Sequence, residues 1–230
     1  GHVPISAEHP LYKKAVSGIL VLKVPLAQLD GKAKLAQNRS PEERQRLMTS
    51  LWSRGLPGDP AAIELLRAAN PDTPLPAFLA APAETSLIVA PTAGDAAAVA
   101  ALLAGSYWNV GSSPEDIAAA HLASSAWVGA RDRDGAWIGS ARAIGDGVKR
   151  AWIYDVIVAG PWRGRGLGEA LMRLLLDHPA IRRARRIYLG TRDAQSFYQR
   201  LGFGDRRVVE EPLRPWPTTE MVLLRAAAAG

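Results

Sequence analysis

A glycine-rich turn carries the clearest chemical signal in this chain. Its six residues are Arg163, Gly164, Arg165, Gly166, Leu167 and Gly168. The glycines allow the backbone to approach a ligand closely, and a segment with apolar residues at helical spacing follows at once. The free N–H groups and positive dipole end of such a helix bind anions, and the two arginines add positive charge. The turn therefore predicts a pyrophosphate site; the structural alternative is a tight connection with solvated arginines.

Two common phosphate-binding motifs are excluded at this turn. The spacing Gly-x-Gly-x-x-Gly of dinucleotide sites is absent, and no acidic residue ends a following strand at the usual distance. The Gly-Lys-Ser/Thr of nucleoside-triphosphate loops is absent as well.

Alternating strands and helices surround the turn from Ser86 onward. The hydrophobic patterns predict strands over 87–89, 127–130, 137–144, 152–158, 187–189 and near 221–224. They predict helices over 96–103, from Ser113, from the turn to near His178, and over 194–201. Asp134-Gly135 indicates a hairpin between the second and third strands. This order predicts an α/β (α+β) fold, with a mixed sheet and helices on its faces.

The first part of the chain has a different pattern. Residues 19–24 predict a buried strand, and helices are expected from Ser40, where Glu43 completes a capping box, and from Asp59. Four prolines between 71 and 82 indicate an extended linker. We therefore expect an N-terminal extension over 1–82 and a second domain over 83–230.

Two ordered signatures in the second domain resemble the GNAT acyl-CoA N-acyltransferases. The family's cofactor motif, Arg/Gln-x-x-Gly-x-Gly/Ala after the fourth strand, is matched by Arg163, Gly166 and Gly168. Its second signature, Ala-x-x-x-Tyr-x-x-x-Gly-Phe, resembles residues 194–203. The resemblance covers roughly residues 86–225 and implies the GNAT fold, acetyl-CoA as co-substrate, and acetyl transfer to a primary amine of an unidentified acceptor, either a small molecule or a peptide.

The resemblance also implies roles for individual residues. The backbone of Ile157 and Val158 would bind the pantetheine arm in an opening between the fourth and fifth strands. Tyr198 matches the tyrosine that protonates the departing thiolate; alternatively it is a half-buried tyrosine that packs with Phe197 and Phe203. Asp155 is a candidate general base, and alternatively a structural carboxylate bonded to the backbone.

The sequence departs from the family pattern at two positions. Tyr154 stands where many relatives have a glutamate before Asp155, and Thr191 replaces an asparagine that often precedes the motif tyrosine. Tyr107 and Trp108 lie where relatives build the acceptor wall; the alternative is that they close the core. With Tyr154, they are the expected substrate-binding residues. The basic run 182–186 could reach the cofactor's ribose phosphate or could form a solvated loop.

The N-terminal segment resembles a second family. Residues 18–40, and especially the run 31–40, are similar to a Gly-Lys-x-Lys-Leu-x-Gln-Asn run near the end of FMN-binding negative transcriptional regulators. The resemblance covers roughly the first 80 residues and only the C-terminal portion of that family, without the strands that would hold flavin. We therefore expect no FMN binding by this chain alone. The resemblance leaves a rival function open: a regulatory or DNA-associated module on a transferase fold with weak turnover.

Composition sets the remaining expectations. The chain has 230 residues, no Cys and a formal net charge of +6, and its four histidines lack metal-ligand spacing. We therefore expect no disulfide and no metal. The positive charge suits a phosphorylated cofactor, and no helix carries a recognisable DNA-reading motif, so we expect no nucleic-acid partner. No apolar run approaches the roughly 18–20 residues that span a bilayer, and no secretion signal is recognised. We expect a cytoplasmic protein without a membrane partner. Because homodimers are common among GNAT acyltransferases, the resemblance also implies a possible homodimer.

Overall fold

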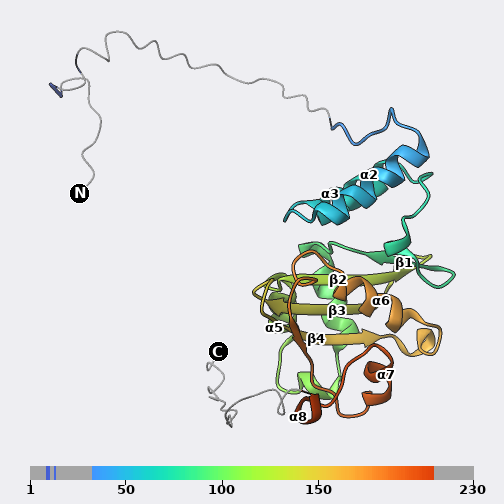
Figure 1. Cartoon of the computed structure of the whole chain (residues 1–230), viewed down its shortest axis with the longest axis vertical. Coiled ribbons are helices and arrows are strands. Elements are labelled where there is room, and N and C mark those ends of the chain that lie inside the picture. The colour runs from blue at the N-terminus through green and yellow to red at the C-terminus, as the bar shows by residue number, and fades with distance from the viewer. Residues whose placement is uncertain (1–8, 11–12, 14–32, 210–230) are drawn as a thin grey trace. The chain divides into compact units, whose positions relative to one another are not determined.

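The computed structural model of this chain describes residues 9–10, 13 and 33–209. By its contacts the chain divides into two units, Gly1–Lys34 and Leu35–Gly230, and the fold below is that of the described residues from Leu35 onward. The strands expected over 19–24 and near 221–224 lie outside the described residues. Helix labels begin at α2, as in Figure 1.

A twisted five-stranded sheet forms the centre of this unit (Figure 1). The strands follow one another in chain order across the sheet, and all neighbours are antiparallel except β4 and β5, which are parallel. Their bounds are β1 Thr85–Ile88, β2 Ala126–Asp132, β3 Trp137–Gly145, β4 Arg150–Val158 and β5 Arg186–Tyr188. The predicted mixed sheet is confirmed.

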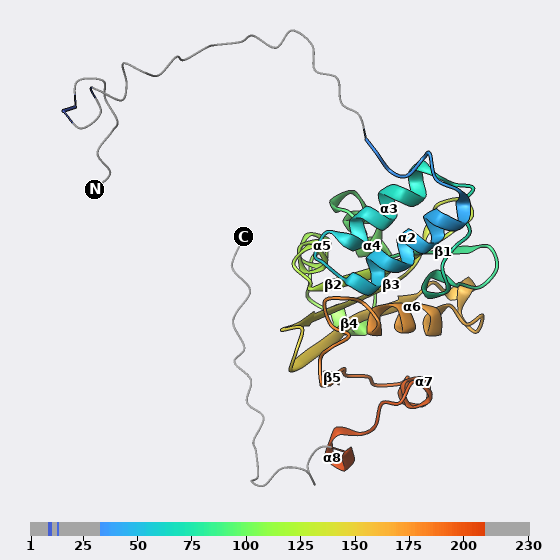
Figure 2. The ribbon, with the colours of Figure 1, turned by 45° about the horizontal axis from the view of Figure 1, so that its top comes forward.

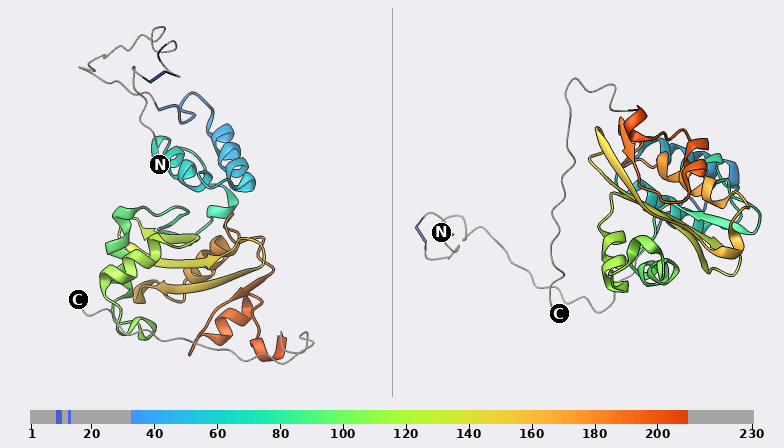
Figure 3. Two further views of the ribbon diagram at one scale, coloured as in Figure 1. Left: turned by 90° about the vertical axis from the view of Figure 1, so that its left-hand side faces the viewer. Right: turned by 90° about the horizontal axis from the view of Figure 1, so that it is seen from below.

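Helices cover both faces of the sheet (Figure 3). One face carries α2 (Pro41–Arg54), α3 (Asp59–Ala69) and α6 (Leu167–Leu176). The other carries α4 (Ala96–Leu103) and α5 (Pro114–Leu122). Two short helices, α7 (Gln195–Arg200) and α8 (Arg206–Val209), follow β5, and single 3-10 turns lie at Ala77–Leu79, Ala93–Asp95, Tyr107–Asn109 and Gly160–Trp162.

Serine caps start two of these helices as the sequence predicts. Ser40 accepts a hydrogen bond from the Glu43 amide, while the Glu43 carboxylate accepts one from the Ser40 amide. Ser113 and Asp116 make the same reciprocal pair at the start of α5. Each box satisfies amides that the first helical turn leaves without partners.

Helices α2 and α3, which lie side by side in Figure 2, share the hydrophobic core of the sheet. Met48 and Ile63 are fully buried in the same cluster as residues of β2, β3 and α6. The indole of Trp52 stacks on Phe78 and donates a hydrogen bond to Asp177, just after α6, over 2.5 Å. The domain division at residue 82 stays a prediction, and residues on both sides of it share one core.

Strand β4 contains a bulge that shapes the region near its C-terminal end. The register with β3 shifts between Ser140 and Arg142, and Asp155 at this point has φ = 52°, in the left-handed region. Bulges bend and twist a strand. The pairing with β5 ends at Trp152↔Tyr188, although β4 continues to Val158. The last six residues of β4 therefore have no β5 partner, and a gap opens between the two strands.

We expect Met48→Ala to destabilise the whole unit, because the side chain is 0% exposed and its removal leaves a cavity beneath α2. Truncations of this kind cost about 2–5 kcal/mol. Urea denaturation followed by circular dichroism measures the change.

Leu47→Ala is the matched control on the same helix, because that side chain is 40% exposed. Its unfolding free energy should change far less. If Met48→Ala instead leaves the main transition in place and adds a separate early one, α2 does not share the core of the sheet.

Candidate functional site

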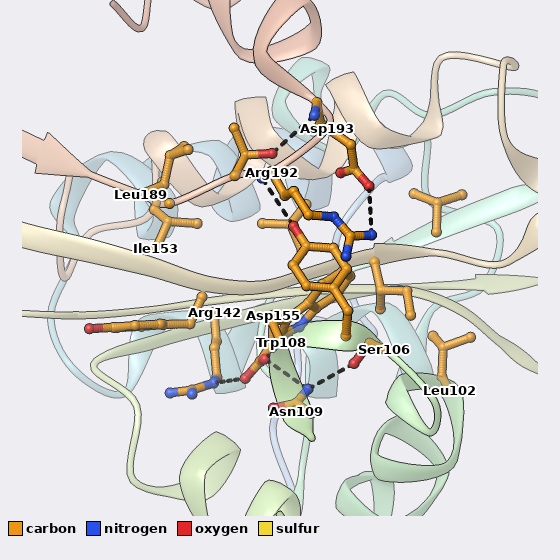
Figure 4. A pocket seen from close by; sticks show the side chains of 18 of the residues that line it. Leu102, Ser106, Trp108, Asn109, Arg142, Ile153, Asp155, Leu189, Arg192 and Asp193 are labelled. Atoms are coloured by element: carbon orange, nitrogen blue, oxygen red, sulfur yellow. Dashed lines mark hydrogen bonds and ion pairs between the residues drawn. The ribbon is translucent and has the colours of Figure 1, made fainter. Parts of the chain in front are cut away.

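A cavity of about 1410 Å³ occupies the gap beyond the last β4–β5 pair. Figure 4 shows that its walls come from segments far apart in the sequence. One wall is β4 and the residues after it, over 152–160; the facing wall is the segment 189–194, with Tyr198 behind it. The end of α4 and the turn after it, over 101–109, close a third side.

The glycine-rich turn leads from one end of this cavity into α6: Arg163 lines the cavity, and residues 164–168 lie beyond its lining. Gly164 and Gly166 have φ of 74° and 83°, so both adopt the left-handed conformation that glycine takes without strain. A Cβ atom on Gly164 would meet nothing within 4 Å, which leaves this backbone open to a ligand. Helix α6 starts at Leu167 without a side-chain cap, so its first amides are available to an anion.

Both predicted arginines of the turn are held near it. The Arg163 Nε donates to the carbonyl oxygen of Val158 over 2.9 Å, and Arg163 lines the cavity. The Arg165 guanidinium lies 5.1 Å from the centre of the Trp162 ring. Gly168 lies inside the first turn of α6, where a Cβ atom would come within 3.4 Å of Phe197. The turn thus joins open backbone to positive charge.

The strand edge that faces the cavity can be read from the ladder between β3 and β4. The Ala159 amide bonds to the Ile138 carbonyl, and Gly139↔Val158 and Ser140↔Ile157 are the next pairs. Because hydrogen-bonded and non-hydrogen-bonded pairs alternate, the backbone of Ile157 faces β3 and that of Val158 faces the gap. Of the two predicted backbone contacts, Val158 is therefore the better placed; Ile157 lines the cavity beside it.

Tyr198 lies at the cavity wall on α7, packed edge-on against Phe197 and Phe203. Burial raises the pKa of its phenol to about 12, with smaller contributions from Tyr107 and Asp193. A phenol with this pKa keeps its proton at neutral pH and can donate it. Thr191, at the position of the family asparagine, accepts a hydrogen bond from the Ala194 amide ahead of α7.

Asp155 is buried and holds several elements together. Its Oδ2 accepts from the Nε of Arg142 over 2.5 Å, and its Oδ1 accepts from Trp108 Nε1 and Asn109 Nδ2, each over 3.1 Å (Figure 4). A carboxylate has about four lone-pair sites, and these donors use three of them. The contacts connect the turn Tyr107–Asn109 to the bulge of β4 through side chains, not through the backbone bonds that the structural alternative expects.

Tyr107 connects the two sides of the cavity. Its hydroxyl oxygen accepts a hydrogen bond from the Arg192 amide over 3.1 Å, and the Arg192 guanidinium lies 3.7 Å from the centre of its ring. Trp108 packs edge-on against Tyr107 at 4.8 Å. Both predicted acceptor-wall residues therefore line the cavity and do not belong to either buried core cluster.

Tyr154, the third predicted substrate-binding residue, lines the cavity on the side of α4 and α5. The centre of its ring lies 5.0 Å from the Cζ atom of the Arg142 guanidinium, which covers one ring face. Arg142, Asn109 and Arg192 are cavity residues that the sequence reasoning missed. Arg142 had a signal: it is the lone charge in the otherwise small and apolar strand 137–145.

The basic run 182–186 includes one residue with a structural role. Arg182 donates to the carbonyl oxygens of Trp52 and Ser53, at the end of α2, over 2.9 and 2.6 Å. None of the five residues lines the cavity.

The described residues contain neither a candidate metal cluster nor a membrane-spanning helix. No group of three or more His, Cys, Asp or Glu side chains among them could hold a metal ion. None of the helices in the described ranges is both long and apolar enough to cross a bilayer.

Comparison with known proteins matches this region to one family. Residues 96–203 match the model of the acetyltransferase (GNAT) family. No curated protein matches the chain.

Solved structures of similar proteins match this chain with TM-scores below 0.5. A protein from Xanthomonas campestris assigned to the GNAT family is 25% identical, with 59% of this chain and 93% of that chain covered and a TM-score of 0.49. A protein from Deinococcus radiodurans assigned as an acetyltransferase is 26% identical, covering 62% and 90%, with a TM-score of 0.45. A GNAT-family acetyltransferase from Streptococcus pneumoniae is 23% identical, covering 62% and 98%, at 0.45. The match to the family model spans strands β2 to β5, the glycine-rich turn and Tyr198, and in this region, residues 96–203, the chain is similar to the GNAT acetyltransferases.

Proposed function

We propose that the protein transfers the acetyl group of acetyl-CoA directly to a primary amine. The observation that carries the proposal is the continuity of the site: Arg163 at the start of the glycine-rich turn, the unpaired edge of β4 and Tyr198 all line one cavity. The uncapped start of α6 follows four residues after Arg163. Acetyl-CoA supplies a diphosphate, a flexible arm and a reactive thioester. The three parts of the site suit these three groups in the same order.

The anion end of the site is suited to a diphosphate. The first amides of α6 point toward the turn, and the helix dipole adds a partial positive charge there. Arg163 and Arg165 bring two full charges to the same place. Backbone amides bind the anion without losing rotamer freedom, so a large part of the recognition needs no side-chain ordering.

The unpaired edge of β4 is suited to an extended, amide-bearing arm. A strand edge presents unpaired N–H and C=O groups that bind a ligand in the manner of an added strand. Val158 faces this gap, and its carbonyl oxygen already accepts from Arg163. An N–H donor on this edge would also polarise an adjacent carbonyl group.

In this proposal Tyr198 and Asp155 carry out the two proton transfers, one to the departing sulfur and one from the amine. Tyr198 donates its proton to the departing sulfur, because a phenol with a pKa of about 12 is fully protonated at neutral pH. Asp155 accepts the amine proton through water at the one lone-pair site that Arg142, Trp108 and Asn109 leave open. Asp155 also positions the wall made by Tyr107 and Trp108.

We expect Arg163→Ala/Arg165→Ala to weaken acetyl-CoA binding by about ten- to a hundredfold, because two charge-assisted contacts to the diphosphate are lost. Isothermal titration calorimetry measures the affinity. Arg46→Ala, an exposed arginine on α2, is the control and should bind as the unaltered protein does. Equal affinity in both variants contradicts a pyrophosphate site at the turn; sequence-specific DNA binding without acetyl-CoA binding would favour the regulatory alternative.

Tyr198→Phe should reduce kcat by about 10²–10⁴-fold, the range of general acid catalysis, while acetyl-CoA affinity changes little. A free-thiol assay and calorimetry give the two quantities. Since the pKa of Tyr198 is about 12, kcat of the unaltered enzyme should show no loss from tyrosine ionisation below about pH 11. An unchanged kcat in the variant removes Tyr198 from the mechanism.

Asp155→Asn should lower the unfolding free energy by about 3–5 kcal/mol, because Arg142 keeps a buried charge without its partner. Chemical denaturation measures this change. The double variant Arg142→Met/Asp155→Asn removes both charges and should recover part of the loss. Restored stability together with restored turnover would show that Asp155 is not the general base; stability without turnover supports that role.

A further inference from the structure

Three aromatic rings lie next to one another, with planes close to parallel, near the end of the cavity away from the glycine-rich turn. Trp152 and Tyr154, on β4, lie with ring centres 6.5 Å apart and planes 22° from parallel. Tyr188, opposite Trp152 on β5, lies 4.9 Å from it with planes 27° apart. Trp152 and Tyr154 line the cavity. We call Trp152, Tyr154 and Tyr188 the aromatic row.

Arginines cover the two outer faces of the aromatic row. The guanidinium of Arg142 lies 5.0 Å from the centre of the Tyr154 ring, and that of Arg206 lies 5.3 Å from the Tyr188 ring. Each arginine covers one outer ring face. The rings of Trp152 and Tyr154, with centres 6.5 Å apart, overlap only at their margins, and they remain 38% and 41% exposed. Both rings therefore present aromatic surface to the cavity.

Exposed aromatic rings favour an aromatic ligand surface. Aromatic pairs adopt offset-stacked or T-shaped arrangements, which stabilise a complex beyond the burial of apolar area. The geometry favours an aromatic group in this part of the cavity.

The charges of the cavity disfavour a polyamine. Among the described lining residues the acids are Asp155 and Asp193, against three arginines at 142, 163 and 192. The side chain of Asp155 is 4% exposed and paired with Arg142, and Asp193 lies 3.4 Å from Arg192. Arg163 belongs to the diphosphate end, so at the acceptor end each acid is paired with an arginine. A ligand with several positive charges therefore meets no unpaired carboxylate in the described lining.

We propose that the acceptor is an arylalkylamine: one primary amine on a short aliphatic arm, with an aromatic body that lies against the rings of Trp152 and Tyr154. This inference rests on the proposed function and names its substrate class. The amine reaches the gap beside Tyr198, while the aromatic row binds the body. Trp152 and Tyr154 are then specificity-determining residues.

Steady-state assays with tryptamine and spermidine, read by free thiol, test the inference on the full chain. The unaltered enzyme should have the higher kcat/KM for tryptamine. Trp152→Ala and Tyr154→Ala should each lower kcat/KM for tryptamine about tenfold, chiefly through KM, because an apolar and aromatic contact is lost. Acetyl-CoA affinity, measured by calorimetry, should stay unchanged in both variants.

Ile144→Ala is the matched control. Ile144 pairs with Trp152 across β3 and β4 and is 47% exposed, yet it does not line the cavity. Its kcat/KM for tryptamine should equal that of the unaltered enzyme. A preference for spermidine, or tryptamine kinetics within twofold of normal in both Trp152→Ala and Tyr154→Ala, overturns the inference.

A binding measurement separates failure of the inference from failure of the proposed function. If no amine supports thiol release, the proposed function fails. Binding of tryptamine is then tested separately, through the indole ¹⁵N–¹H spectrum of the unaltered protein with CoA. Adding tryptamine should shift the Trp152 signal, which the spectrum of Trp152→Phe identifies among the seven tryptophans. An unshifted Trp152 signal overturns the inference. This measurement uses the unaltered protein, so it remains decisive even if the alanine variants do not fold.

Discussion

A buried ion pair between neighbouring strands organises this site. Asp155 stands in the bulge of β4 at a φ of 52°, a conformation that costs a non-glycine residue energy, although less for aspartate than for most. The Arg142 guanidinium from β3 binds its carboxylate, and Trp108 and Asn109 bind the other oxygen. Taking both charges out of water is costly, and the additional hydrogen bonds offset that cost. The bulge, the turn after α4 and one wall of the cavity are all fixed at this point.

Backbone groups form one end of the site, and side chains form the other. The end proposed for the diphosphate uses backbone: left-handed glycines, the first amides of a helix and an unpaired strand edge. The other end uses side chains: Tyr107 held by Arg192, Trp108 held by Asp155, and the aromatic row between two arginines. A backbone site can be kept across many sequences that share a fold. A side-chain site differs wherever those residues differ, which is where a family of transferases can vary its acceptors.

This division explains what the sequence could predict. Helix caps at Ser40 and Ser113, the glycine-rich turn and the period-2 strands depend on residues close together in the chain, and the structure confirms these elements near their expected bounds. The pairing of Arg142 with Asp155, and of Tyr107 with Arg192, joins residues 13 and 85 positions apart. Such pairings depend on strand register and on the bulge, which no local pattern specifies. The prolines of 71–82 indicated a linker, yet the packing of Met48 and Trp52 into the sheet's core is tertiary and was not readable from composition.

The attachment of α2 to the end of α6 bears on how the protein can be divided. Trp52 is held by Asp177 and Phe78, and Arg182 returns to bind the carbonyl oxygens at the end of the same helix. A fragment that begins at residue 83 would keep α6 on this face of the sheet and lose α2 and α3 beside it. It would leave an Asp177 carboxylate and an Arg182 guanidinium without their indole and carbonyl partners, beside apolar side chains newly exposed to water. We therefore expect a stably folded fragment of this chain to keep both helices that precede the proline-rich segment.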